Sequence, residues 1–176
     1  MMMQMLAAGG MPVLTDDVRK ADDDNPRGYL ELEKAKKIKQ DSSWLADAEG
    51  KAFKMVAMLL YNLPPDRQYK IVFMRRDLTE MLKSQATMLK NLGKTGNGPT
   101  DEEMRILFEE HLKKITAWLA SQENMEVLYC EYADVVKDPK AQAERVAAFL
   151  GATLDINKMT ASVDPKLYRK KIGVVE

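Results

Sequence analysis

Residues 69–84, with the sequence YKIVFMRRDLTEMLKS, decide the fold of this chain. The first seven of them follow a Pro-Pro-Asp turn and are rich in β-branched and aromatic side chains, so they predict a β-strand. A helix is expected directly after this strand, because apolar residues recur at positions 78, 81, 82 and 89. Strands that alternate with helices are typical of a parallel sheet with helical cover.

The later part of the chain repeats this alternation. Residues 126–131 (EVLYCE) predict a second strand. Asp138 as N-cap, Pro139 at the first helical position and Gly151 just past the end bracket a helix. We therefore predict an α/β fold, with residues 70–75 and 126–131 as neighbouring or near-neighbouring strands of a small parallel sheet.

Helices and one further strand are predicted elsewhere. Residues 1–8 (MMMQMLAA) favour a helix, and residues 29–39 favour a charged surface helix. Residues 51–63 predict a short strand and then a helix that stops before two prolines. A capping-box pattern at Thr100 and Glu103 opens a long helix. The sequence shows no repeat and no second domain, so residues 1–176 are predicted to form a single domain.

The composition limits the classes of function. Apolar residues make up 45% and charged residues 31% of the chain, as in ordered globular proteins. Lys and Arg together number 27, as do Asp and Glu, so bulk attraction to nucleic acid or to an anionic membrane is not expected. No run approaches the ~20 apolar residues of a membrane span. An anion site, if present, is therefore expected to be local.

Two residue types occur only once. Cys130 is the single cysteine, so no intrachain disulfide can form, and a reducing, cytoplasmic setting is expected. His111 is the single histidine, and a Ser-His-Asp triad, a Cys-His pair or a zinc site would each depend on it alone. We interpret His111 as structural or solvent-exposed, and no metal is expected.

The end of the first strand is the best candidate site. Arg75 and Arg76 lie at its carboxyl end, where ligands of α/β sheets gather, and a helix N-terminus that favours anions follows. Adjacent strand residues face opposite ways, so only one of the two arginines can easily face a ligand. An arginine fork suits phosphate, although a solvated pair of arginines would explain the same sequence.

Arg76 and Ser84 are eight residues apart, directly after an apolar strand. This spacing resembles the 3′-phosphate-binding motif of the sulfotransferase family, in which a serine follows an arginine eight residues later. In that family the pair holds the 3′-phosphate of 3′-phosphoadenosine 5′-phosphosulfate (PAPS). The resemblance implies that Arg76 and Ser84 bind the cofactor.

Other segments agree with this resemblance in order, and together they span residues 1 to about 168. The run VLYCEYAD at 127–134 resembles a later strand and turn of the family, with Tyr132 at the position of a tyrosine that contacts the nucleotide. The run GKAFK places Lys54 where the family has a lysine near the transferring sulfuryl group. The run DNPRGYLE at 24–31 resembles a loop of bacterial sulfotransferase-like proteins.

The chain also departs from the family pattern. Family members open with a strand and a Pro-x-Ser-Gly-Thr type loop that holds the 5′-phosphosulfate, whereas residues 1–8 resemble the helix after that loop. We therefore expect a P-loop-NTPase-like sulfotransferase fold that lacks its first strand and phosphate loop. Val56 stands where the family has a catalytic histidine, and residues 170–173 (KKIG) match the family's late Arg-Lys-Gly loop only loosely.

The resemblance implies a PAPS-dependent sulfotransferase that transfers a sulfuryl group to a hydroxyl or amine of a small molecule, a glycan or a peptide. Lys54 would be catalytic, and the truncated chain is expected to be inactive. A non-catalytic interaction module of the same fold is one alternative, and a P-loop kinase-like enzyme is another. Gly93-Lys94-Thr95 imitates a Walker A ending, but Met88 replaces the required earlier glycine. Neither the acceptor nor the oligomeric state can be read from the sequence.

Overall fold

The computed structural model describes residues 1–16, 18–22, 25–91 and 99–165. In chain order its elements are α1 (Met2–Ala8), α2 (Glu33–Lys36), the 3-10 helices η1 (Ser43–Ala48) and η2 (Ala57–Asn62), β1 (Tyr69–Arg75), α3 (Leu78–Asn91), α4 (Asp101–Ala120), β2 (Met125–Glu131), α5 (Tyr132–Lys137), α6 (Pro139–Leu150) and α7 (Ile156–Ala161).

The two strands pair in parallel along their whole length. Tyr69 lies opposite Met125 and Arg75 opposite Glu131. The Tyr69 N–H donates to the carbonyl of Asn124 at 2.9 Å, which starts the ladder. The prediction of neighbouring parallel strands is confirmed. The carboxyl ends of both strands consequently lie side by side.

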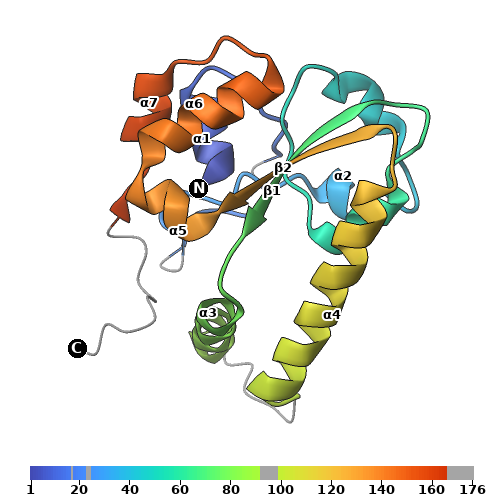
Figure 1. The fold of residues 1–176 in the computed structure, drawn as a ribbon, viewed down its shortest axis with the longest axis vertical. Helices are drawn as coiled ribbons and strands as arrows, with labels where there is room; N and C mark the ends of the chain where they lie inside the picture. The colour runs from blue at the N-terminus through green and yellow to red at the C-terminus, as the bar shows by residue number, and fades with distance from the viewer. Residues whose placement is uncertain (17, 23–24, 92–98, 166–176) are drawn as a thin grey trace.

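Helices lie on both faces of the sheet (Figure 1), and an apolar core lies on each face. Phe73 packs on one face with residues of η1, η2 and α4, whereas Val72 and Met74 pack on the other face with residues of α1, α6 and α7. This division follows from the two-residue period of a strand, which sends neighbouring side chains to opposite faces. Cys130 is fully buried in the second core.

Helix ends form as their sequence signals predict. The Thr100 hydroxyl accepts from the Glu103 N–H at 3.2 Å while the Glu103 carboxylate accepts from the Thr100 N–H at 2.8 Å, so the capping box is complete. Asp138 caps α6 through the Ala141 N–H, and Gly151 ends it with a φ of 65°. That left-handed conformation favours glycine at this position.

Two predicted elements are wrong in extent. The helix expected over 29–39 is reduced to α2, since its lysine-rich sequence places like charges three residues apart. The strand expected at the start of 51–63 is only a single bridge between Ala52 and Val13, followed by η2. A short apolar run lacks a distinguishing period, and here it has no continuous strand partner.

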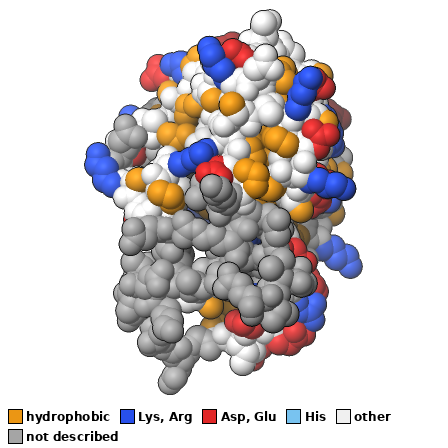
Figure 2. All heavy atoms as spheres, turned by 90° about the vertical axis from the view of Figure 1, so that its left-hand side faces the viewer, with side chains coloured by type: hydrophobic (Ala, Val, Ile, Leu, Met, Phe, Trp, Pro, Cys, Tyr) orange, Lys and Arg blue, Asp and Glu red, His pale blue; other side chains and the backbone are white. Residues whose placement is uncertain are grey.

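The surface carries charges of both signs. On the face seen in Figure 2, the described residues show Lys, Arg, Asp and Glu side chains interspersed with apolar ones. This agrees with the equal totals of 27 basic and 27 acidic residues. Among the described helices, none combines the length and the apolar character needed to cross a membrane.

Candidate functional site

Two predicted site residues meet just beyond the ends of the strands. Arg76 follows the last residue of β1, and Tyr132 follows the last residue of β2. The guanidinium carbon of Arg76 lies 5.0 Å from the centroid of the Tyr132 ring, within the range of a cation–π contact. Burial raises the pKa of the Tyr132 hydroxyl, and the charge of Arg76 opposes that rise. The phenol is therefore neutral at physiological pH.

Arg75 takes a different environment, as the alternation along a strand requires. Its guanidinium carbon lies 4.0 Å from the ring centroid of Tyr129, and its Nη1 lies 4.0 Å from the Glu131 carboxylate. Arg76 instead contacts Tyr132 and Glu80. The two adjacent arginines thus have separate sets of partners, and only Arg76 is placed with the predicted nucleotide tyrosine.

The first turns of α3 add a carboxylate and a hydroxyl. The Arg76 Nε lies 3.5 Å from the Glu80 carboxylate, whose side chain is only 5% exposed. The Glu80 N–H donates to the Asp77 carboxylate at 3.0 Å, which fixes the start of the helix. Ser84 is half-buried one turn beyond Glu80, and residues four apart share one face of a helix. Glu80 was missed at the sequence level, although its position four residues after Arg76 is the spacing of a helical ion pair.

Lys54 lies in another charged group, built around Glu31. The Lys54 Nζ donates to one oxygen of Glu31 at 2.9 Å, and the Lys36 Nζ lies 3.0 Å from the other. Arg19 approaches the same carboxylate at 3.3 Å, and its guanidinium carbon lies 3.4 Å from the Tyr29 ring centroid. Glu31, the last residue of the run DNPRGYLE, therefore contacts Lys54. The sequence did not predict this contact, because the two residues are far apart along the chain.

The electrostatics of this group are those of a carboxylate held by cations. Burial alone would raise the pKa of Glu31, but the hydrogen bonds and charges of Lys54 and Lys36 outweigh it, and the pKa is lowered. Tyr29 has a raised pKa because it is partly desolvated and donates to the Asp22 carboxylate at 2.8 Å. Glu31 is thus ionised near neutral pH and holds Lys54 in place.

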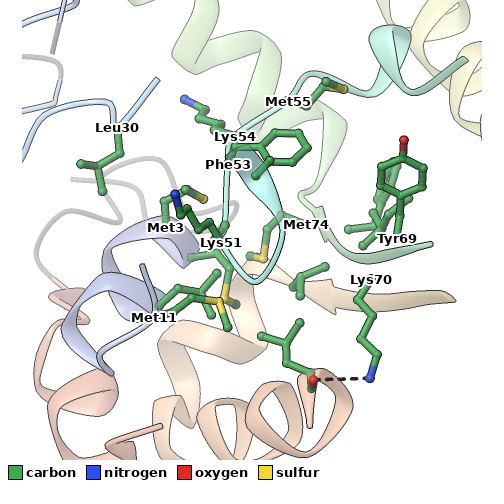
Figure 3. A pocket seen from close by; sticks show the side chains of 18 of the residues that line it. Met3, Met11, Leu30, Lys51, Phe53, Lys54, Met55, Tyr69, Lys70 and Met74 are labelled. Atoms are coloured by element: carbon green, nitrogen blue, oxygen red, sulfur yellow. Dashed lines mark hydrogen bonds between the residues drawn. The ribbon is translucent and has the colours of Figure 1, made fainter. Parts of the chain in front are cut away.

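A cavity of about 950 Å³ runs along β1, and of these two groups of residues it is lined by the one around Lys54. Its walls come from α1, from the segment around Phe53 and from β1, and they include Met3, Met11, Met55 and Met74 (Figure 3). Lys54 and Lys51 line it as well. Lys70 also lines it, and its Nζ donates to the carbonyl of Phe149 at 2.9 Å. The cavity is therefore mainly apolar, with basic side chains on its wall.

The other residues named from the sequence are less central. Val56 is 58% exposed and offers no proton acceptor. His111 lies on α4, and its buried Nε2 has no hydrogen-bond partner in the described part of the chain. Residues 93–95 and 170–173 lie outside the described residues. In the ranges that the structure describes, no three His, Cys, Asp or Glu side chains gather as metal ligands.

Comparison with known protein families gives a match to the sulfotransferase domain over residues 46–168. The chain belongs to the sulfotransferase family. The matched region of this sulfotransferase-family chain contains Lys54, Arg76, Ser84 and Tyr132. No curated protein and no solved structure matches the chain. The resemblance noted in the sequence is therefore confirmed at the level of the family, and a transferase of the sulfotransferase class is the activity that the domain supports.

Proposed function

We propose that this sulfotransferase-family chain binds a 3′-phosphoadenylyl nucleotide at the carboxyl ends of β1 and β2. The observation that carries the proposal is the placement of Arg76 5.0 Å from Tyr132, at the end of two adjacent parallel strands. Ligands of open α/β sheets bind at such ends. Arg76 and Ser84 would hold the 3′-phosphate, and Tyr132 would line the nucleotide site.

The proposed reaction is transfer of a sulfuryl group from PAPS to a hydroxyl or amine of a small molecule, glycan or peptide. The acceptor oxygen or nitrogen forms a bond to sulfur as the bond from sulfur to the bridging phosphate oxygen breaks. Adenosine 3′,5′-bisphosphate leaves, and the acceptor proton passes to solvent or to a base. Like phosphoryl transfer, this chemistry depends on positioning and on stabilising charge on the leaving oxygen. Lys54 would supply part of that charge, once released from Glu31.

A binding assay tests the nucleotide site directly. We expect the chain to bind adenosine 3′,5′-bisphosphate more tightly than adenosine 5′-phosphate, because only the former presents a 3′-phosphate to Arg76. Isothermal titration calorimetry of both ligands measures the difference. ATP with Mg²⁺ serves as the third ligand, and a preference for it would favour a kinase-like enzyme instead. Equal affinity for the first two ligands would contradict the proposed site.

We further propose that the sheet is completed by a strand outside the described residues, on the free edge of β1. In a parallel pair, the backbone N–H and C=O groups of alternate residues point to the partner strand. Because Tyr69 bonds to β2, the N–H and C=O groups of Lys70, Val72 and Met74 point to the opposite edge. These residues line the cavity, and no backbone bond to them on that edge comes from the part of the chain described. Parallel sheets are normally buried, and two strands alone are marginal.

Such a strand would lead into a loop that holds the 5′-phosphosulfate. Donors in such a loop would stabilise the charge on the leaving oxygen, and loss of even one preorganised donor of this kind lowers the reaction rate by about 10²–10³. We therefore expect residues 1–176 alone to give no detectable transfer from labelled PAPS to a panel of hydroxyl acceptors. A longer version that supplies the strand and loop should bind PAPS and turn it over. Robust turnover by residues 1–176 alone would contradict this part of the proposal.

A non-catalytic interaction module is the second candidate. The observation that favours it is Val56, which is exposed where the family has its catalytic histidine and which cannot take a proton. This candidate predicts nucleotide binding without transfer, even in a longer version of the protein. Turnover measured with that longer version separates the two candidates.

A further inference from the structure

Among the described residues, Glu80 is the only charged residue that is buried, with a relative exposure of 4%. A buried carboxylate is unfavourable unless a cation or hydrogen-bond donors compensate it. One cationic contact of Glu80 is Arg76, whose Nε lies 3.5 Å from a carboxylate oxygen and whose own side chain is 27% exposed. A buried carboxylate therefore contacts a partly exposed guanidinium at the end of β1.

The guanidinium of Arg76 is restrained in two directions. Glu80 contacts its Nε, on the edge nearest the side-chain stem, and its central carbon lies over the Tyr132 ring, 5.0 Å from the ring centroid. The two restraints come from α3 and from the residue after β2, so they are independent of each other. A planar fork that is held at its Nε and lies over an aromatic ring has fewer directions open to its two Nη groups.

We propose that Glu80 is a positioning residue, which orients Arg76 through its Nε so that the Nη groups meet the 3′-phosphate of the nucleotide. This inference rests on the proposed function. It assigns Glu80 an indirect role: the carboxylate contacts the arginine and does not contact the ligand. Without Glu80, Arg76 would lose one of these restraints and would give up more rotamer freedom when the nucleotide binds. Ordering such a side chain weakens binding by roughly twofold to tenfold.

The opposite role for Glu80 is electrostatic competition. A carboxylate beside Arg76 also repels an incoming phosphate and neutralises part of the arginine charge. Competition predicts that removal of Glu80 strengthens nucleotide binding, whereas positioning predicts that it weakens binding. The sign of one measured change therefore separates the two roles.

The test is calorimetric titration of the 176-residue chain and its variants with adenosine 3′,5′-bisphosphate and with adenosine 5′-phosphate. Glu80→Ala should weaken binding of the bisphosphate roughly twofold to tenfold and leave binding of the monophosphate unchanged. Glu80→Gln should restore most of the affinity, because its amide oxygen can still accept from the Arg76 Nε. Thr79→Ala, an exposed neighbour on α3, is the matched control and should behave as the wild type.

A second readout does not depend on the ligand. The Nε–Hε signal of Arg76 in ¹⁵N NMR should be ordered in the wild type and in Glu80→Gln, and should become mobile in Glu80→Ala. In an Arg76→Ala background, Glu80→Ala should bring no further loss of bisphosphate affinity.

Three outcomes would overturn the inference: tighter binding by Glu80→Ala, an unchanged bisphosphate affinity, or equal losses for both nucleotides. If the wild type itself fails to prefer the bisphosphate, the proposed function fails, and the positioning role fails with it. If the wild type shows that preference and Glu80→Ala binds the bisphosphate as tightly as the wild type does, only the positioning role fails.

Discussion

The Arg76 guanidinium and the Tyr132 ring lie 5.0 Å apart, although the two residues are separated by two long helices in the sequence. Their contact follows from the register of the sheet, in which Arg75 pairs with Glu131 and each strand ends at that pair. One residue after each strand, at Arg76 and at Tyr132, the chain leaves the sheet at its carboxyl end. A cation and an aromatic ring therefore lie together at the carboxyl ends of the strands, where parallel sheets bind their ligands.

Arg76→Ala should weaken binding of adenosine 3′,5′-bisphosphate by about 1.5–3 kcal/mol, the range for hydrogen bonds to charged groups, or roughly 10- to 150-fold. Ser84→Ala should cost less, because its hydroxyl offers one neutral bond. Neither change should affect adenosine 5′-phosphate. Arg75→Ala is the control, since Arg75 contacts Tyr129 and Glu131 instead. Calorimetry measures the binding of both nucleotides by each of the three variants, and equal losses for both nucleotides in Arg76→Ala would count against this placement.

Acid should destabilise the fold partly through Glu31. Its pKa is lowered from the ordinary value of 4.5 in the folded chain, because the bonds from Lys54 and Lys36 outweigh the effect of burial. A lowered pKa contributes stability that is present above the unfolded value and is lost as the pH falls through the folded value. We therefore expect the melting temperature of the wild type to fall more than that of Glu31→Gln as the pH is lowered from about 5. Thermal unfolding of both proteins at a series of pH values measures this difference. Parallel pH profiles of the two proteins would contradict this role for Glu31.

Helix α4 offers a matched pair for the packing of the first core. Ile115 is 0% exposed, so Ile115→Ala should lower the free energy of unfolding by about 2–5 kcal/mol, through lost burial and the cavity left behind. Ile106 lies on the same helix at 46% exposure, and Ile106→Ala should change stability by less than about 1 kcal/mol. Urea denaturation of both variants tests the difference, and similar losses would show that α4 packs differently.

Amide exchange should alternate along β1. The N–H groups of Ile71 and Phe73 point toward β2, as that of Tyr69 does, whereas those of Val72 and Met74 point to the opposite edge of β1. Hydrogen exchange followed by NMR should find Ile71 and Phe73 protected and Val72 and Met74 fast. A longer version of the protein that completes the sheet should protect all four. Uniform protection in residues 1–176 would mean that the edge of β1 is already paired.

Local sequence determined the elements whose signals lie within a few residues. The β-branched run of β1, the capping box of Thr100 and Glu103, and the Pro139–Gly151 bracket all appear where predicted, because propensity and capping act over one or two turns. The Arg76–Ser84 spacing likewise indicated the family, which the domain match over residues 46–168 confirms.

Tertiary structure decided what depends on distant partners. Residues 51–56 carry an apolar pattern suited to a strand, yet only Ala52 finds a bridge, since strand formation needs a neighbour of matching length. Two contacts join segments that are far apart in the sequence. They are the ion pair between Glu31 and Lys54 and the cation–π contact between Arg76 and Tyr132. Such contacts are set by the register of β1 on β2 and by the packing of helices on each face, which no local pattern encodes.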